Sequence, residues 1–266
     1  MSACAILMYH AVDRPQSRVE ASLCCDPAAF SAQIDYLHRH RYAVIPLAQL
    51  VRALRGGGDL PQRAVVITFD DGLSCSCETA LPILGRFGFA ATIFVVAGLV
   101  DRSNEWLRSA GFPARRMLSG AGLRSLIAAG WDVGSHSLTH PWLSRLPLSA
   151  ARAEVRDSKS RLEDLVGRQV AHFAYPYGDY TAAVRDSVME AGYAAACSTR
   201  WGRFHASRQL FALRRVEIRG QDSLLQFAAK LRLGTHHVPP LPEARSLVRA
   251  GLEAIGCLPR RYPADL

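Results

Sequence analysis

The chain has 266 residues, of which 49% are hydrophobic and 21% charged, so it suits one large or two small globular domains. Its net charge of +9 comes almost entirely from arginine, because Lys159 and Lys230 are the only lysines. The arginines are spread along the chain and form no basic block interleaved with aromatic residues, so we expect no nucleic-acid partner. An anionic substrate and peripheral contact with membrane headgroups stay open.

Cysteine usage and the start of the chain favour a reducing compartment. The seven cysteines form no CxxC pair, so we interpret them as reduced, buried thiols. The apolar residues 1–9 lack the basic region and the cleavage site of a signal peptide. The longest apolar run, residues 89–100, is too short to span a bilayer. We therefore expect a soluble, cytoplasmic protein, with the inner face of the membrane as the alternative.

Strand and helix patterns alternate along the chain. A helix is predicted to open at Pro27, with Asp26 as its N-cap. Short apolar runs predict strands at residues 5–9, 44–45, 65–69, 91–96, 131–134, 173–175, 194–197 and 213–218. Amphipathic stretches predict further helices at residues 47–54, 81–87, 122–129, 150–166, 181–191 and 224–231. Six or more such units without an internal repeat predict a parallel α/β fold, most simply a barrel.

The barrel interpretation also predicts where chemistry is found and where the domain ends. Catalytic residues of a barrel lie at the C-terminal ends of its strands, and residues 101–120 are predicted to form a loop over that mouth. A Rossmann fold is excluded because no GxGxxG follows the first strand. Residues 1–233 are predicted as one domain and residues 234–266 as a Pro/Arg-rich appendage with a short helix near 244–255. His236 and His237 are interpreted as part of a solvated linker.

Two adjacent carboxylates, Asp70 and Asp71, follow the predicted strand 65–69 and precede Gly72. Neighbouring carboxylates repel, so keeping both ionised requires a compensating positive charge, for which a metal ion is a common solution. The alternative is an ordinary solvated junction between a strand and a turn.

Two histidines, His136 and His140, follow the predicted strand 131–134. If a helical turn begins there, both imidazoles project from one face; the alternative is two unrelated loop histidines. One carboxylate and two imidazoles supply three ligands and leave a position for water or substrate, as in catalytic metal sites. Such donors suit one divalent ion, with Zn²⁺ expected first and Co²⁺, Fe²⁺, Mn²⁺ or Ni²⁺ as alternatives.

Three motifs occur in the order typical of the polysaccharide deacetylases, carbohydrate esterase family four or NodB-homology domain: TFDDG at 68–72, HSLTH at 136–140 and YPYG at 175–178. With LMYH at 7–10, the chain resembles the exopolysaccharide and surface-glycan branch over roughly residues 5–230. The resemblance implies a distorted (β/α) barrel with about seven parallel strands. It also implies a hydrolase that releases acetate from an N-acetylated amino sugar. The expected cytoplasmic location favours a sugar precursor or a lipid-linked glycan intermediate over a mature wall polymer as its substrate.

The resemblance further implies a division of labour within the site. Asp70 is the general base, while Asp71, His136 and His140 hold the metal. The backbone N–H of Tyr177 faces the developing oxyanion.

Two further residues are candidates for contact with the substrate. They are Pro176 in the third motif and Trp106 in the predicted mouth loop. For the Tyr177 ring, simple packing is the alternative.

Two departures from the family pattern concern proton transfer. Ala174 stands where the family often has an arginine that orients the base, so Arg215 on a late strand is the candidate replacement. We predict that Arg215 pairs with Asp70, with a surface salt bridge as the alternative. The late Leu-x-His motif that supplies the general acid is missing. His10 is the candidate acid, and a core or substrate-binding histidine is the alternative.

Two other functions stay open at this point. One is an amidohydrolase of the same fold that cleaves a non-peptide C–N bond in a non-sugar substrate. The other is a catalytically silent glycan-binding module, against which the presence of every predicted metal ligand argues.

Overall fold

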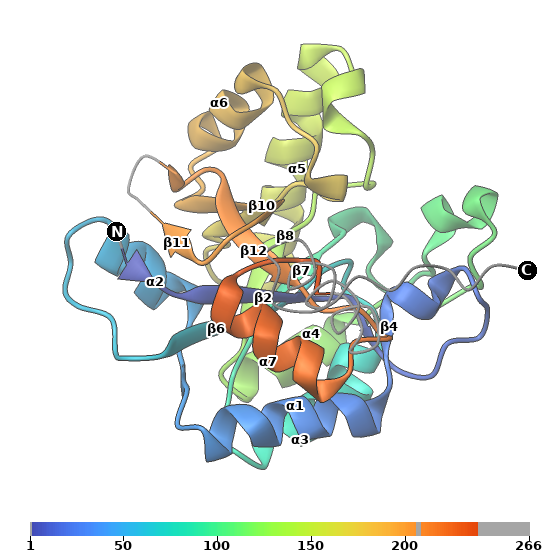
Figure 1. The fold of residues 1–266 in the computed structure, drawn as a ribbon. Helices are drawn as coiled ribbons and strands as arrows, with labels where there is room; N and C mark the ends of the chain where they lie inside the picture. The colour runs from blue at the N-terminus through green and yellow to red at the C-terminus, as the bar shows by residue number, and fades with distance from the viewer. Residues whose placement is uncertain (1, 206–208, 239–266) are drawn as a thin grey trace, which may run out of the picture. The chain divides into compact units, whose positions relative to one another are not determined.

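The computed structural model describes residues 2–205 and 209–238. Its centre is a closed barrel of seven parallel strands in the order β2, β12, β10, β9, β8, β7, β6 and back to β2 (Figure 1). The strands are β2 (Ala5–Tyr9), β6 (Ala64–Phe69), β7 (Thr92–Val95), β8 (Asp132–Ser135), β9 (His172–Ala174), β10 (Ala195–Trp201) and β12 (Leu213–Glu217). A further strand, β5 (Ala43–Val44), pairs with β6 outside the closed ring. The predicted parallel barrel is confirmed.

Helices connect the strands in the predicted order. They are α1 (Pro27–Arg39), α2 (Leu47–Leu54), α3 (Leu81–Gly85), α4 (Gly120–Ala128), α5 (Leu148–Val166), α6 (Ala182–Glu190) and α7 (Leu224–Leu233). As predicted, Asp26 caps α1, its carboxylate accepting the Ala28 N–H at 2.8 Å. The segment predicted as a helix over 81–87 ends earlier, at Gly85, and continues from a π-helical turn, η2 (Ser76–Ala80).

Short elements decorate this frame. Two pairs of strands were not predicted, β1 (Ser2–Ala3) with β11 (Phe204–His205) and β3 (Ala11–Val12) with β4 (Cys24–Cys25). In the part of the chain that the structure describes, 3-10 turns occur at η1 (Glu20–Ser22), η3 (Ala97–Leu99), η4 (Glu105–Ala110), η5 (Leu143–Arg145) and η6 (Pro176–Gly178). Among the described residues, no helix is both long enough and apolar enough to cross a bilayer.

Strand alternation separates the core into two parts and directs one carboxylate inward. In β6, Val65, Ile67 and Phe69 belong to the core between the strands and the helices, whereas Val66 belongs to a second cluster inside the barrel. Side chains two and four positions after Val66, those of Thr68 and Asp70, therefore point to the same inner face. Asp70 directly follows β6, so its carboxylate points into the barrel.

The chain divides into a compact unit of Met1–His236 and a second unit of His237–Leu266. The helix predicted near 244–255 lies outside the described residues. The prediction of a solvated linker is wrong for His236, which is half-buried. Its Nδ1 accepts the Glu217 N–H at 2.9 Å and its Nε2 donates to the Thr199 carbonyl at 2.6 Å, so the ring bridges β12 and β10.

Candidate active site

Asp70 and Asp71 lie at the C-terminal end of β6, and both are buried. The Asp70 N–H donates to the Tyr9 carbonyl at 2.9 Å, which extends the pairing of β6 with β2. Asp71 (φ 70°) and Gly72 (φ 81°) are then both left-handed, which turns the chain at the mouth of the barrel. A Cβ on Gly72 would lie 3.2 Å from the Val95 Cα, so β7 leaves no space for a side chain there. This turn keeps the two carboxylates at one site.

His136 and His140 lie in the loop after β8, and the helical turn expected there is absent. Two left-handed residues, Ser137 (φ 63°) and His140 itself (φ 65°), fold this loop instead. The Ser137 hydroxyl accepts the His140 N–H at 3.0 Å, and Glu154 of α5 accepts the Leu138 N–H at 2.9 Å. The two imidazoles converge without a helical turn, because a spacing of four suits a compact loop as well as a helix. Left-handed conformations at non-glycine residues cost energy and concentrate at functional sites.

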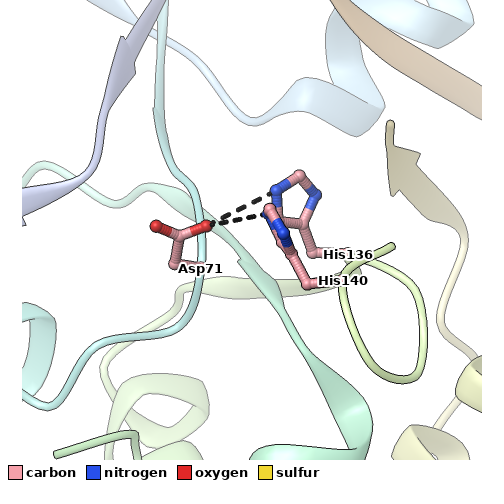
Figure 2. Close-up of side chains that lie close together, drawn as sticks. All are labelled: Asp71, His136 and His140. Carbon is pink, nitrogen blue, oxygen red and sulfur yellow. Dashed lines mark ion pairs between the residues drawn. The ribbon is translucent and has the colours of Figure 1, made fainter. Parts of the chain in front are cut away.

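The three predicted metal ligands converge, as Figure 2 shows. One ligand atom from each of Asp71, His136 and His140 lies within 4.8 Å of the others. The Oδ1 of Asp71 is 3.6 Å from the Nε2 of His136 and 3.4 Å from the Nε2 of His140. Ligand atoms about 2.1 Å from a tetrahedral ion lie about 3.4 Å from one another. The arrangement therefore fits one small divalent ion.

The protonation states of these groups also suit a cation. The Nδ1 of His136 donates to the Ala174 carbonyl at 2.8 Å, so its Nε2 presents a lone pair towards Asp71. Burial lowers the pKa of His136 to about 4, which keeps the ring neutral at pH 7. Burial raises the pKa of Asp71, but its interaction with His140 outweighs this and holds the pKa below its usual range. A carboxylate and a neutral imidazole are the forms that bind metal.

Arg215 pairs with Asp70 inside the barrel, as predicted. Its Nη1 and Nη2 donate to Oδ1 and Oδ2 of Asp70 at 2.6 and 2.7 Å, and both side chains are buried. Arg215 also donates to the Thr68 hydroxyl at 3.3 Å and to the Ser198 carbonyl at 3.0 Å. Burial raises the pKa of Asp70, but the Arg215 guanidinium outweighs it and holds the pKa below its usual range. Asp70 is therefore an ionised, doubly anchored carboxylate at neutral pH.

His10 directly follows β2 and is half-buried. Interaction with His10 is one of several causes that lower the pKa values of Asp70 and Asp71, so His10 lies near the acid pair. Its role as the general acid stays a prediction.

Aromatic rings cover one side of the site. Trp106 of η4 stacks on His140 with 4.7 Å between ring centroids, so the predicted mouth segment reaches a candidate metal ligand. The Tyr177 ring contacts His140 edge-on, with 4.6 Å between ring centroids. The Tyr177 ring also stacks on Trp142, with 4.1 Å between centroids and 6° between ring planes. The Arg145 guanidinium lies 4.5 Å from the Trp142 ring centroid. Trp142 and Tyr177 are 40% and 38% exposed, so this stack presents aromatic surface to solvent beside the candidate metal ligands.

Pro176 is buried and begins η6, in which Tyr177 is left-handed (φ 58°). Within the described part of the chain, the Tyr177 N–H has no hydrogen-bond acceptor. That donor is therefore available for a ligand.

Arg115 ties the segment that carries Trp106 to the loop after β3. Its guanidinium donates to Glu20 at 2.7 and 3.1 Å and to Asp13 at 2.6 Å. Its backbone N–H donates to the Asn104 Oδ1 at 2.7 Å. Burial raises the pKa of Glu20, but the hydrogen bonds from Arg115 outweigh it and lower the pKa. Arg115 therefore links the segment that carries Trp106 to the segment that follows β3.

Sequence reasoning missed Trp142, Glu154 and Arg115. Trp142 carries a local signal, a large aromatic residue two positions after His140. The other two have no such signal, because Glu154 acts on Leu138, 16 residues away, and Arg115 acts across 95 residues.

Comparison with known proteins assigns the chain to a protein family. Residues 57–196, just over half of the chain, match the family model described as polysaccharide deacetylase. The chain belongs to the polysaccharide deacetylase family. This membership confirms the resemblance and the predicted class of enzyme, a polysaccharide N-deacetylase. The match includes the acid pair and both metal-site histidines, whereas His10 and Arg215 lie outside it.

Individual relatives agree with the family assignment. YxkH of Bacillus subtilis, named as a candidate polysaccharide deacetylase, is 24% identical over 80% of this chain and 70% of its own. The poly-β-1,6-N-acetyl-D-glucosamine N-deacetylase of Escherichia coli K12 is 25% identical over 77% of this chain and 35% of its own. The Streptococcus pyogenes deacetylase PplD, solved in complex with acetate, has a TM-score of 0.75 at 25% identity, covering 86% of this chain and 98% of its own.

Proposed function

We propose that this chain is a metal-dependent hydrolase that removes the acetyl group from an N-acetylated amino sugar of a glycan. The observation that carries the proposal is the convergence of Asp71, His136 and His140 beside a separate, anchored carboxylate, Asp70. A bound divalent ion, with Zn²⁺ as the first candidate and Co²⁺, Fe²⁺, Mn²⁺ or Ni²⁺ as alternatives, would polarise the acetamide carbonyl and acidify water.

The protein's own groups then move the protons. Asp70 accepts a proton from the water that adds to the carbonyl carbon, and Arg215 holds both carboxylate oxygens in place while it does so. The free Tyr177 N–H donates to the oxygen on which negative charge develops. His10 protonates the amine as the C–N bond breaks, so that acetate and a free amino sugar leave.

The exposed stack of Trp142 and Tyr177 supports a sugar ring as the group beside the acetamide. Aromatic faces pack against apolar ring surfaces while the polar rims stay in water. The relative from E. coli is named for a β-1,6-linked N-acetylglucosamine polymer. We propose a glycan or a lipid-linked glycan intermediate as the substrate.

A reducing compartment is the location that we propose, the cytoplasm or the inner face of the membrane. Its support is the set of free thiols Cys24, Cys25, Cys75, Cys77 and Cys197. Redox-state labelling of the protein in its native cells tests this, because oxidised thiols would overturn it.

The test of function measures metal and acetate together. The purified protein is analysed for bound metal, then stripped with a chelator and reloaded with single ions, and acetate release from N-acetylglucosamine oligomers and an N-acetylated lipid-linked sugar is followed. Asp70→Asn is expected to abolish acetate release and keep the metal, and Asp71→Asn is expected to lose both. Asp186→Asn is the control, because Asp186 is exposed and its ion pair among the described residues is with its neighbour Arg185.

Two results favour the other functions. Bound metal without acetate from any sugar supports an amidohydrolase with a non-sugar substrate. Glycan binding without bound metal supports a silent module and overturns the proposal.

A further inference from the structure

A second cavity, of about 510 Å³, lies away from the acid pair. Its lining includes Ala5 and Ala64, the first residues of β2 and β6, whereas Asp70 follows the last residue of β6. Six strand residues at about 3.3 Å each separate the two ends by about 20 Å. This cavity is therefore at the N-terminal ends of these strands and is no part of the site described above.

Three arginines from separate parts of the chain line this cavity. They are Arg63, which precedes β6, Arg203, which follows β10, and Arg232 of α7. Within the described residues, the lining contains no carboxylate. Like charges gathered in one concavity repel, and a bound anion relieves that repulsion.

All three arginines share one neighbour in the lining, Tyr42. Burial and Tyr36 raise the pKa of Tyr42, while the charges of Arg63, Arg203 and Arg232 all oppose this rise. A basic concavity is thus formed by tertiary structure, although the arginines are far apart in the sequence.

The wall of the cavity is ordered by contacts of its own. The Nη1 of Arg63 donates to the His40 carbonyl at 2.8 Å, and its Cζ lies 5.9 Å from the Tyr42 ring centroid. The rings of Tyr36 and His40 lie 4.0 Å apart, and Tyr36 and Tyr42 lie 6.4 Å apart. A guanidinium has five N–H donors, so the bond to His40 leaves Arg63 with others for a ligand. The lining of the cavity therefore combines arginine guanidiniums with aromatic rings.

We propose that this cavity binds a phosphate-bearing molecule, with the phosphate on the three guanidiniums and the organic part against Tyr36 and Tyr42. The planar fork of arginine matches phosphate oxygens in a bidentate manner. A volume of about 510 Å³ is that of a small-molecule site and exceeds the needs of a single inorganic ion. The phosphate comes from a free phosphorylated compound or from a lipid headgroup, and both present the same chemistry.

The test uses the full chain loaded with its metal. Phenyl phosphate, which carries one phosphate and one aromatic ring, is titrated by calorimetry, and co-sedimentation is measured with phosphatidylglycerol vesicles and with phosphatidylcholine vesicles. The variants are Arg63→Ala and Arg232→Ala, both at exposed positions. The control is Arg116→Ala, which removes an exposed arginine paired with Glu78 elsewhere on the surface.

Each arginine variant is expected to weaken binding about ten-fold, because a charge-assisted hydrogen bond is lost. Arg116→Ala is expected to bind as the wild type does, and added salt to weaken binding in all proteins. Acetate release is expected to be unchanged in all three variants. The assay of acetate release therefore tests the proposed deacetylase function independently of ligand binding at this cavity.

Arginine-dependent binding of phenyl phosphate alone supports a free phosphorylated ligand. Arginine-dependent binding of the anionic vesicles supports a lipid headgroup. Absence of both, or binding that survives in Arg63→Ala and Arg232→Ala, overturns the proposal.

Discussion

Replacing Arg215 is the sharpest test of how the catalytic base is held. The side chain is fully buried and makes four hydrogen bonds: two to Asp70 at 2.6 and 2.7 Å, one to Thr68 at 3.3 Å and one to Ser198 at 3.0 Å. Arg215→Ala leaves the Asp70 carboxylate buried without its partner, which is expected to lower the free energy of unfolding by about 3–5 kcal/mol. Arg215→Lys keeps one charge but cannot span both oxygens, so a smaller loss of about 1.5–3 kcal/mol is expected.

The effect on catalysis follows from the position of Asp70. Displacing a reacting group by about 1 Å costs about 100-fold in rate, and Arg215→Lys frees Asp70 to move by that amount. We therefore expect kcat to fall about 100-fold in Arg215→Lys and further in Arg215→Ala. KM and bound metal are expected to stay near the wild-type values, because Arg215 contacts neither the metal ligands nor the exposed aromatic stack.

Urea unfolding measures the stability change, acetate release measures kcat and KM, and elemental analysis measures the metal. Arg214→Ala is the matched control, since strand alternation places Arg214 on the opposite face of β12. A folded Arg215→Lys protein with wild-type kcat would refute the reasoning, as would an equal loss of activity in Arg214→Ala.

Three further predictions concern the surroundings of the site. Arg115→Ala is expected to raise KM and the rate of proteolysis within residues 101–118, because it removes the bonds to Glu20 and Asp13. Arg116→Ala, at an exposed position, is expected to change neither quantity. Equal effects in both variants would contradict this prediction. The lowered pKa of Glu20 means that the folded state binds fewer protons there, so its stabilisation is present above the unfolded pKa of about 4.3 and is lost as the pH falls. Glu20→Gln should therefore flatten the acid limb of stability measured by urea unfolding between pH 3 and 7, and an unchanged limb would exclude this linkage. Trp142→Ala is expected to raise KM for sugar oligomers about five-fold, with Trp142→Phe close to wild type, and unaltered binding of oligomers by the alanine variant would remove the stack from the substrate site.

Much of the fold and part of the site could be predicted because the relevant signals are local. The apolar run before Asp70 and Asp71 predicts a buried strand, and a barrel places whatever follows such strands at one mouth. His136 was assigned to the metal site for the same reason. The conformation of its loop was not predictable, because left-handed backbone at Ser137 and His140 leaves no periodic trace in the sequence.

Short-range patterns of apolar and polar residues were enough to predict the strands of the barrel and the carboxylate and imidazole groups that follow them, but not the short strand pairs outside the barrel. Which distant side chains meet depends instead on tertiary packing. The pair of Arg215 and Asp70 spans 145 residues and forms because β12 and β6 both pair with β2 in the closed barrel. The tie from Arg115 to Glu20 and the basic cavity around Arg63 arise in the same way. Contacts of this kind depend on ring closure and on packing, which no local pattern records.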